Sequence, residues 1–345
     1  MTGSKSIVTR IIFILFIWLG ALLSSRALAL DHTQLAVIIN TADPLSVQIG
    51  NYYAAQRRIP VQNIIKVDFA PGRNSLSRHE FEAVRLSIEK STRQGVQAYA
   101  LTWAAPYRVE CMSITSALAF GFDPRYCAEG CKATRQSIYF NSPASLPYEQ
   151  LRIRPTMTIA ATTFGQAKAL IDRGIMSDAS SPAATAYLLS TSDKVRNVRS
   201  NSYPLIMKML GNGHVRAHRI EQDALRGARD VLFYFTGLER VEGLQTLHFV
   251  PGAIADHLTS VGGMLTDSPQ MSALRWLEAG ATGSYGTVVE PCAIPQKFPN
   301  ALIVIGRYLQ GETLIEAYWK SVAMPGQGIF IGEPLAAPFR RKAMN

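Results

Sequence analysis

The 345-residue chain lacks the short motifs that mark common catalytic folds. It has no P-loop, no GxGxxG turn and no GxSxG nucleophile elbow. Its six histidines show neither HxH nor HExxH spacing, so no metal-ligand set stands out. We therefore expect no cofactor and no metal, and the sequence leaves open whether the protein is an enzyme.

The chain also lacks a concentrated charge of either sign. Its formal net charge is +10, but the arginines are scattered and no basic stripe is interleaved with aromatic residues. Nucleic acid is therefore not an expected partner. The excess of basic over acidic residues predicts a solvated basic surface, and a modest attraction to anionic lipid or acidic polysaccharide is the alternative.

Long apolar runs are absent except at the N-terminus. Lys5 and Arg10 flank the start of an apolar run over 11–25, and Ala27-Leu28-Ala29 follows as a small-x-small cleavage signal. The run is shorter than the roughly 20 residues that a bilayer span needs. We expect 1–29 to be a signal peptide and the remainder to be periplasmic or extracellular. The alternative is an uncleaved anchor, which would be the expected membrane contact.

Cysteine is scarce, with four residues in the whole chain. In an exported protein an even number predicts disulfides, here two with three possible pairings. The CxxxC spacing within the set could also hold a metal, but no nearby motif completes four ligands. The disulfide candidates are Cys111, Cys127, Cys131 and Cys292.

From residue 30 onward, short apolar runs alternate with amphipathic helices. This pattern predicts an α/β fold in which a mostly parallel sheet carries helices on both faces. The first unit has a strand at 35–40, an N-cap at Asp43 and a helix from Pro44. Further strands are expected at 63–69, 96–103, 186–190, 215–220, 231–235, 247–255 and 283–289, and further helices at 79–92, 164–172, 203–210, 271–279 and after Thr313.

No linker or composition shift divides the chain, so residues 30–345 are expected to form a single domain. Gly174 is expected to stop the helix at 164–172. The segment 104–155 is irregular and contains three of the four cysteines. Because structureless loops longer than about 15 residues are uncommon, this insertion is expected to be functional or held by disulfides.

In open α/β sheets, ligands bind beyond the carboxyl ends of the strands. The polar residues at those ends are our binding candidates, although strand ends also place such residues as turn and cap formers. They are Asn40, Arg108, Asp193, Thr236, Gly237 and Glu290.

The densest group of candidate catalytic residues is Asp256, His257, Thr259 and Ser260. A histidine oriented by a carboxylate can activate a hydroxyl as a nucleophile. Neighbours on a strand point to opposite faces, so Asp256 orients His257 only if the backbone turns there. The alternative is that Asp256 and Ser260 cap a glycine-rich loop. A dyad of Cys292 with His257 would need a reduced thiol, and a disulfide is the preferred interpretation.

Longer stretches of the chain resemble a known family. The segments LAVIINTADPLSVQIGNYYAAQRRIPVQNI, AYLLSTSDKVRNVRS, GATGSYGTVVEPC and EAYWKSV are similar to an exported bacterial family from species that carry exosortase, the proposed sorting transpeptidase for proteins with a C-terminal PEP signal. The family has no established reaction. The resemblance implies a periplasmic or surface role in exosortase-linked export or exopolysaccharide production, with components or substrates of that sorting system as partners.

The chain also resembles the caspase-hemoglobinase superfold, particularly gingipain-like peptidases, which implies a three-layer sandwich. In that pattern the catalytic histidine would fall near Thr236-Gly237, the catalytic cysteine near Thr259-Ser260 and the closing segment on Gly332-Glu333-Pro334. Neither catalytic residue is present at those places. The resemblance implies a pseudo-enzyme or binding component. A peptidase-like hydrolase that uses 256–260 and a structural scaffold of a surface assembly are the alternatives.

Overall fold

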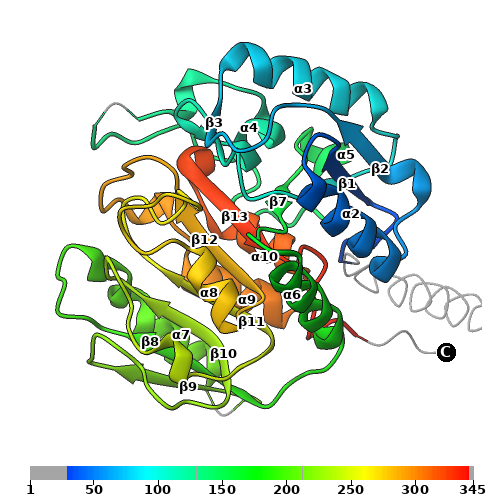
Figure 1. Cartoon of the computed structure of the whole chain (residues 1–345). Coiled ribbons are helices and arrows are strands. Elements are labelled where there is room, and N and C mark those ends of the chain that lie inside the picture. The colour runs from blue at the N-terminus through cyan, green and yellow to red at the C-terminus, as the bar shows by residue number, and fades with distance from the viewer. Residues whose placement is uncertain (1–28, 129, 212, 342–345) are drawn as a thin grey trace, which may run out of the picture.

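The computed structural model describes residues 29–128, 130–211 and 213–341. The expected signal segment lies outside these residues, apart from Ala29. A ten-stranded sheet forms the middle layer, in the order β2-β1-β4-β7-β13-β12-β11-β10-β8-β9 (Figure 1). Its strands are β1 (Leu35–Asn40), β2 (Ile64–Val67), β4 (Ala98–Leu101), β7 (Thr156–Thr158), β8 (Ala184–Leu189), β9 (Val215–Ile220), β10 (Val231–Thr236), β11 (Phe249–His257), β12 (Gly283–Thr287) and β13 (Gly328–Gly332).

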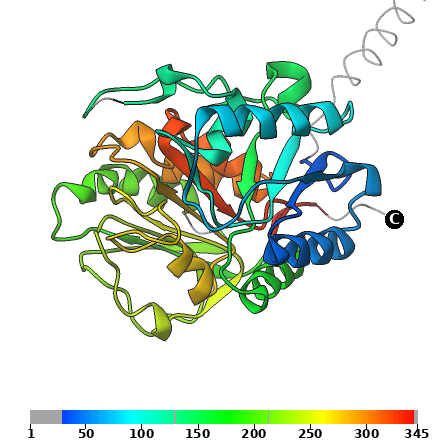
Figure 2. The ribbon, with the colours of Figure 1, turned by 45° about the horizontal axis from the view of Figure 1, so that its top comes forward.

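Helices cover both faces of this sheet, which confirms the expected fold class (Figure 2). One face carries α2 (Pro44–Arg57), α6 (Phe164–Ser177) and α8 (Leu274–Ala279). The other face carries α3 (Arg78–Ser91), α4 (Ile114–Phe120), α7 (Tyr203–Leu210), α9 (Ala301–Leu309) and α10 (Leu314–Ser321). Within the described ranges, none of the helices combines the length and the apolar character that crossing a membrane requires.

Strand β13 reverses direction relative to its neighbour β12. The two pair antiparallel, from Gly283 opposite Gly332 to Thr287 opposite Gly328. Asp267, in the loop after β11, accepts from Tyr107 at 2.6 Å and from Asn74 at 2.5 Å, and these residues follow β4 and β2. The carboxyl ends of β2, β4 and β11 therefore share one edge of the sheet, whereas Glu333, after β13, lies at the other edge against the end of α2.

Local signals account for many of the elements. All six residues of β1 are buried, and Asp43 caps α2 by accepting a hydrogen bond from the Leu45 N–H at 2.9 Å. The helix ends where Arg58 adopts a left-handed conformation with φ 53°. The predicted bounds of β1, α7 and β9 agree with the structure.

The expected end of α6 at Gly174 is wrong, because the helix continues to Ser177. Gly174 lies instead at a close contact between α6 and the segment after β13. A Cβ atom at this position would lie 2.5 Å from Cγ of Glu333. The glycine is thus required for packing between elements rather than for ending the helix.

The insertion at 104–155 is not structureless. It contains α4, the short helix α5 (Pro147–Leu151) and a small sheet of β3 (Ser75–Leu76), β5 (Arg108–Val109) and β6 (Met112–Ser113). Two disulfides hold it, Cys111–Cys127 within the insertion and Cys131–Cys292 to the loop after β12. All three possible pairings would join the insertion to Cys292, and in the structure Cys131 makes this bond.

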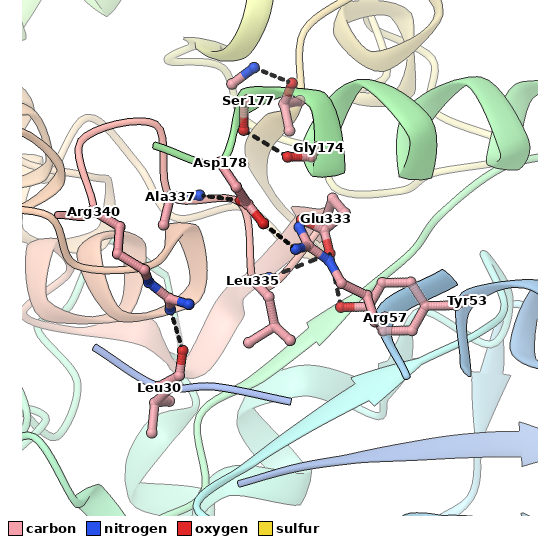
Figure 3. A network of polar contacts seen from close by, with 12 residues as sticks. Leu30, Tyr53, Arg57, Gly174, Ser177, Asp178, Glu333, Leu335, Ala337 and Arg340 are labelled. Carbon is pink, nitrogen blue, oxygen red and sulfur yellow. Dashed lines mark hydrogen bonds and ion pairs between the residues drawn. The ribbon is translucent and has the colours of Figure 1, made fainter. Parts of the chain in front are cut away.

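Tyr53, Arg57, Asp178 and Glu333 form a polar clasp between α2, the end of α6 and the segment after β13 (Figure 3). The Arg57 guanidinium donates to Glu333 at 2.9 Å through Nε and 2.5 Å through Nη2, and it also pairs with Asp178. The Tyr53 hydroxyl donates to Glu333 at 2.8 Å, and burial raises its pKa. The Glu333 side chain is 0% exposed, so the clasp compensates a fully buried carboxylate.

Candidate functional site

The candidates that the sequence grouped at strand ends are spread along the sheet. Asn40 ends β1, and four strands, β4, β7, β13 and β12, separate β1 from β11. Its side chain donates to the Phe69 carbonyl at 3.0 Å and accepts from the Ala42 and Phe69 N–H groups at 3.2 Å. Arg108 lies in the small sheet, in β5. The structure gives Asn40 a role in closing a turn, away from the other candidates.

Asp256 points toward the face that carries α10. It forms an ion pair with Arg199 from the 3₁₀ helix η3 (Arg196–Ser202), and the two side chains are 1% and 4% exposed. Nη2 of Arg199 also donates to the Thr236 carbonyl at 2.7 Å. Burial raises the pKa of Asp256, whereas the Arg199 charge acts against this shift.

His257 points toward the opposite face, under α8. Its Nδ1 accepts a hydrogen bond from the Trp276 indole N–H at 2.9 Å, and its Nε2 contacts the Met271 carbonyl at 3.1 Å. This pair of contacts requires the neutral ring with its proton on Nε2. Burial lowers the pKa of His257 from 6.5 to about 3. Both ring nitrogens are therefore used within the protein, and His257 is poorly suited to act as a base.

The two hydroxyl candidates after β11 are not hydrogen-bonded to His257. Oγ1 of Thr259 donates to Gln270 at 2.8 Å. The backbone carbonyl of Ser260 accepts from Oγ1 of Thr287 at 2.8 Å. The structure does not bring Asp256, His257, Thr259 and Ser260 together as a triad, and the backbone turn that such a triad needed is not found in β11.

Asp193, Thr236 and Gly237 position η3. Asp193 accepts from the Arg196 N–H at 3.0 Å and pairs with the Arg196 guanidinium at 2.7 Å. A Cβ atom on Gly237 would lie 1.9 Å from the Arg196 carbonyl oxygen, so only glycine allows this approach. Together these contacts hold η3 where Arg199 can reach Asp256.

A pocket of 430 Å³ lies on this face, beyond the ends of β10 and β11. We call it the strand-end pocket. Its walls come from the insertion, from η3, from the loop after β12 and from the end of α10. The lining residues are Gln136, Phe140, Val198, Arg199, Asn201, Ser202, Pro295, Gln296, Phe298, Pro299, Asn300, Ala301, Ser321 and Ala323.

The strand-end pocket is nearly neutral. Arg199 is the single ionisable residue in its described lining, and Asp256 pairs with it. Tyr285, next to the pocket, donates to the Lys297 carbonyl at 2.6 Å. Amide side chains, hydroxyls, aromatic rings and prolines make up most of the remaining wall. Such a surface can offer hydrogen bonds and flat apolar contacts, but no net charge.

Glu290 lies outside this lining and is exposed. Its Oε1 accepts from the Cys292 N–H at 2.7 Å, and its carbonyl accepts from Nε2 of Gln327 at 2.8 Å. It therefore shapes the turn that leads into the Cys131–Cys292 disulfide. All four cysteines are oxidised, so the dyad of Cys292 with His257 is not formed.

A larger cavity of 720 Å³ lies beside α8 and the 3₁₀ helix η4 (Leu244–Thr246). Arg226 and Arg275 line it, and both are paired, with Glu242 at 3.2 Å and with Glu278 at 2.5 Å. It contains no buried ion pair. In the described part of the chain, no group of three His, Cys, Asp or Glu side chains is placed to hold a metal ion.

Sequence reasoning missed Arg199 and the loop at 295–301. The available signal was the spacing of Arg196 and Arg199, because residues three apart lie on the same side of a 3₁₀ helix. The proline-rich sequence after Cys292 also indicated an ordered loop. Neither signal specified a partner for Arg199, because Asp256 lies 57 residues further along the chain.

Comparisons with known proteins give little further information. No protein-family model matches the chain, and no curated protein matches it. A solved structure described as "Structure of Protease" is similar over 90% of this chain and 79% of its own chain, with 9% sequence identity and a TM-score of 0.43. At this level the similarity carries no argument about activity.

Proposed function

We propose that this protein is a non-catalytic binding protein that holds a neutral saccharide segment in the strand-end pocket. The observation that carries the proposal is the pocket itself. It lies at the carboxyl ends of two central parallel strands, where ligands bind in α/β sheets. Its described lining combines amide and hydroxyl side chains with aromatic rings, and its single charge is already paired.

The absence of reactive groups around the pocket supports binding rather than catalysis. The lining that the structure describes contains no histidine, no thiol and no carboxylate. His257 lies on the other face with both ring nitrogens engaged. A hydrolase would need a base within hydrogen-bond reach of a nucleophile.

The chemistry of the wall favours an uncharged ligand that is rich in hydroxyl groups. Gln136, Gln296 and Asn201 provide donors and acceptors, while Phe140 provides a partly exposed aromatic ring. Within the described lining, the one charged side chain, Arg199, is already paired with Asp256 and does not offer a free counter-charge to a charged ligand. A peptide that adds to an edge strand is less well supported, because β10 and β11 are interior strands of the sheet.

The proposal extends to cellular context on the basis of the sequence resemblance. Two disulfides are typical of an oxidising compartment. We propose that the protein is exported and that its saccharide ligand belongs to exopolysaccharide made alongside exosortase-linked export. Deletion of the gene is expected to change the surface polysaccharide of the host. An unchanged polysaccharide would contradict this extension without affecting the binding proposal.

Binding can be tested by calorimetry with neutral oligosaccharides, acidic oligosaccharides and terminally capped peptides. Neutral oligosaccharides are expected to bind with a Kd of roughly 1 mM or tighter. The variant Q136A/Q296A removes two exposed amides from the pocket and should weaken binding about thirtyfold, since each lost hydrogen bond is worth about 1 kcal/mol. The matched control is Q245A, an exposed glutamine in the larger cavity, which should bind normally.

Two results would overturn the proposal. Binding of capped peptides without oligosaccharide binding would replace the saccharide with a peptide. Labelling of Thr259 or Ser260 by an electrophilic activity probe would favour the hydrolase alternative. Simultaneous replacement of His257 and Ser260 by alanine should leave binding unchanged in a protein that folds normally.

A scaffold function has one observation in its favour. Helix α7 exposes apolar side chains, with Leu205 57% and Met209 40% exposed. A surface assembly could bury these residues between copies of the chain. The scaffold alternative predicts stable oligomers in light scattering, dispersed by L205E/M209E. A monodisperse monomer at high concentration would contradict it.

A further inference from the structure

Both polar backbone groups of Leu30, the N–H and the carbonyl, are hydrogen-bonded within the protein. Its N–H donates to Oε2 of Glu316 at 3.1 Å, and its carbonyl accepts from the Arg340 guanidinium (Figure 3). Its side chain belongs to the hydrophobic core and is 1% exposed. The first strand begins only at Leu35, so this anchoring precedes any regular structure.

The acceptor of the Leu30 N–H is a buried carboxylate. Glu316 is the third residue of α10 and closes a capping box, in which Oε2 accepts from the Thr313 N–H at 3.0 Å and the Thr313 hydroxyl at 2.5 Å. Burial raises the pKa of Glu316. In the described part of the chain, all its hydrogen-bond donors are neutral.

The charged side chains near Glu316 already have other partners. Lys320, one turn further along α10, pairs with Glu312 at 2.8 Å and lies over the Tyr139 ring. Arg307 also faces Glu312, at 3.4 Å. Arg340 is bonded to the Leu30 carbonyl. A buried carboxylate without a cation of its own is costly, so the site is suited to one further positive charge at the Leu30 nitrogen.

We propose that the Ala29–Leu30 bond is a processing site, and that the α-ammonium group released at Leu30 forms a buried ion pair with Glu316. In the cleavage, water adds across the amide bond: Ala29 leaves with the new carboxylate, and the Leu30 nitrogen becomes an amine that takes up a proton at neutral pH. The ammonium has three donors where the amide has one. The small-x-small sequence Ala27-Leu28-Ala29 ends at the same bond.

The proposal is independent of the saccharide proposal and makes the processed terminus part of the fold. Because Leu30 is buried, the bond must be cut before this part of the protein closes. A chain that is uncut places a neutral amide at Glu316, and a chain cut elsewhere places its ammonium outside the site. Cleavage at the Ala29–Leu30 bond therefore stabilises the mature protein more than cleavage at another bond.

The test compares a chain that begins at Leu30 with one that begins at Ala29, both released from a removable fusion partner. The unfolding equilibrium constant, from urea titration, is expected to be at least tenfold smaller for the chain that begins at Leu30. The difference should disappear when both chains carry Glu316→Gln, and it should persist when both carry Glu312→Gln. This double-mutant cycle assigns the effect to the pair of Leu30 and Glu316.

Two further measurements keep the test decisive if Glu316→Gln does not fold. Acetylation of the Leu30 amine leaves one N–H and removes the charge, so it should abolish the advantage over the Ala29 chain. Because the ion pair needs a protonated amine, the advantage should also shrink at alkaline pH. Equal stability of the acetylated and free chains, or a mature N-terminus that mass spectrometry of the exported protein maps away from Leu30, would overturn the proposal.

Discussion

Asp256 and His257 are consecutive in β11, yet they serve opposite faces of the sheet. Asp256 pairs with Arg199 and so fixes η3, whereas His257 accepts from Trp276 and so fixes α8. The alternation of side chains along a strand makes this separation unavoidable when the strand does not turn. In the sequence the two residues resemble a catalytic dyad, but in the structure they make separate structural contacts on the two faces of the sheet.

Replacing Asp256 should destabilise the protein strongly. In D256A the Arg199 guanidinium stays buried without its counter-ion, which is expected to cost about 3–5 kcal/mol of unfolding free energy. D256N keeps an acceptor oxygen and should lose less. The control E242Q breaks an exposed pair with Arg226 and should change stability by less than about 1 kcal/mol. Urea denaturation measures all three, and a D256A loss within the range of the control would contradict a paired role for Arg199.

His257 should make stability depend on pH below neutrality. The folded protein keeps the ring neutral down to about pH 3, while the unfolded chain takes up a proton below the ordinary value of 6.5. The stability that the buried neutral ring contributes is fully present above pH 6.5 and is lost as the pH falls toward 3. The slope from this one group approaches about 1.4 kcal/mol per pH unit.

The matched variant for this prediction is H257Q, which retains an acceptor for Trp276 and a donor for Met271 but does not titrate. Denaturation curves between pH 7 and 4 should show a flatter profile for H257Q. Parallel profiles for the two proteins would mean that His257 is protonated in the folded state.

The polar clasp gives a third prediction. R57A leaves Glu333 buried without a cation and should cost about 3–5 kcal/mol. R57K keeps the charge but cannot reproduce the forked contacts to Glu333 and Asp178, so its loss should be intermediate. The control R73A breaks an exposed pair with Glu80 and should cost less than about 1 kcal/mol. Equal losses for R57A and R73A in thermal denaturation would show that Glu333 is solvated in solution.

Local sequence signals were sufficient for much of the fold. The apolar run at 35–40, the cap at Asp43 and the helix start after Thr313 each depend on signals within one turn or one strand, and the structure has all three. The fold class also follows from the alternation of such elements. Helix α9 and the strands β7 and β13 were missed. The GIFIG sequence of β13 is short and contains two glycines, which weakens a strand signal.

The missed strand β13 had the largest consequence for the polar clasp. Because β13 pairs antiparallel to β12, it places Glu333 at the edge opposite to the loop after β11 and within reach of Tyr53 and Arg57. Strand direction depends on pairing between residues distant in sequence, here Gly283 with Gly332, and no local pattern encodes it. The same reason hid the partnership of Arg199 with Asp256.

The last prediction concerns the Cys131–Cys292 disulfide, which joins two walls of the strand-end pocket. It ties the insertion that contributes Gln136 to the loop that contributes Gln296. It spans 161 residues of sequence, against 16 for Cys111–Cys127, so its loss should cost more, about 5 against about 3 kcal/mol on a chain-entropy estimate. C131S/C292S should also weaken oligosaccharide binding in calorimetry, whereas C111S/C127S should retain it. Equal affinities in the two variants would show that the pocket walls are held without this bridge.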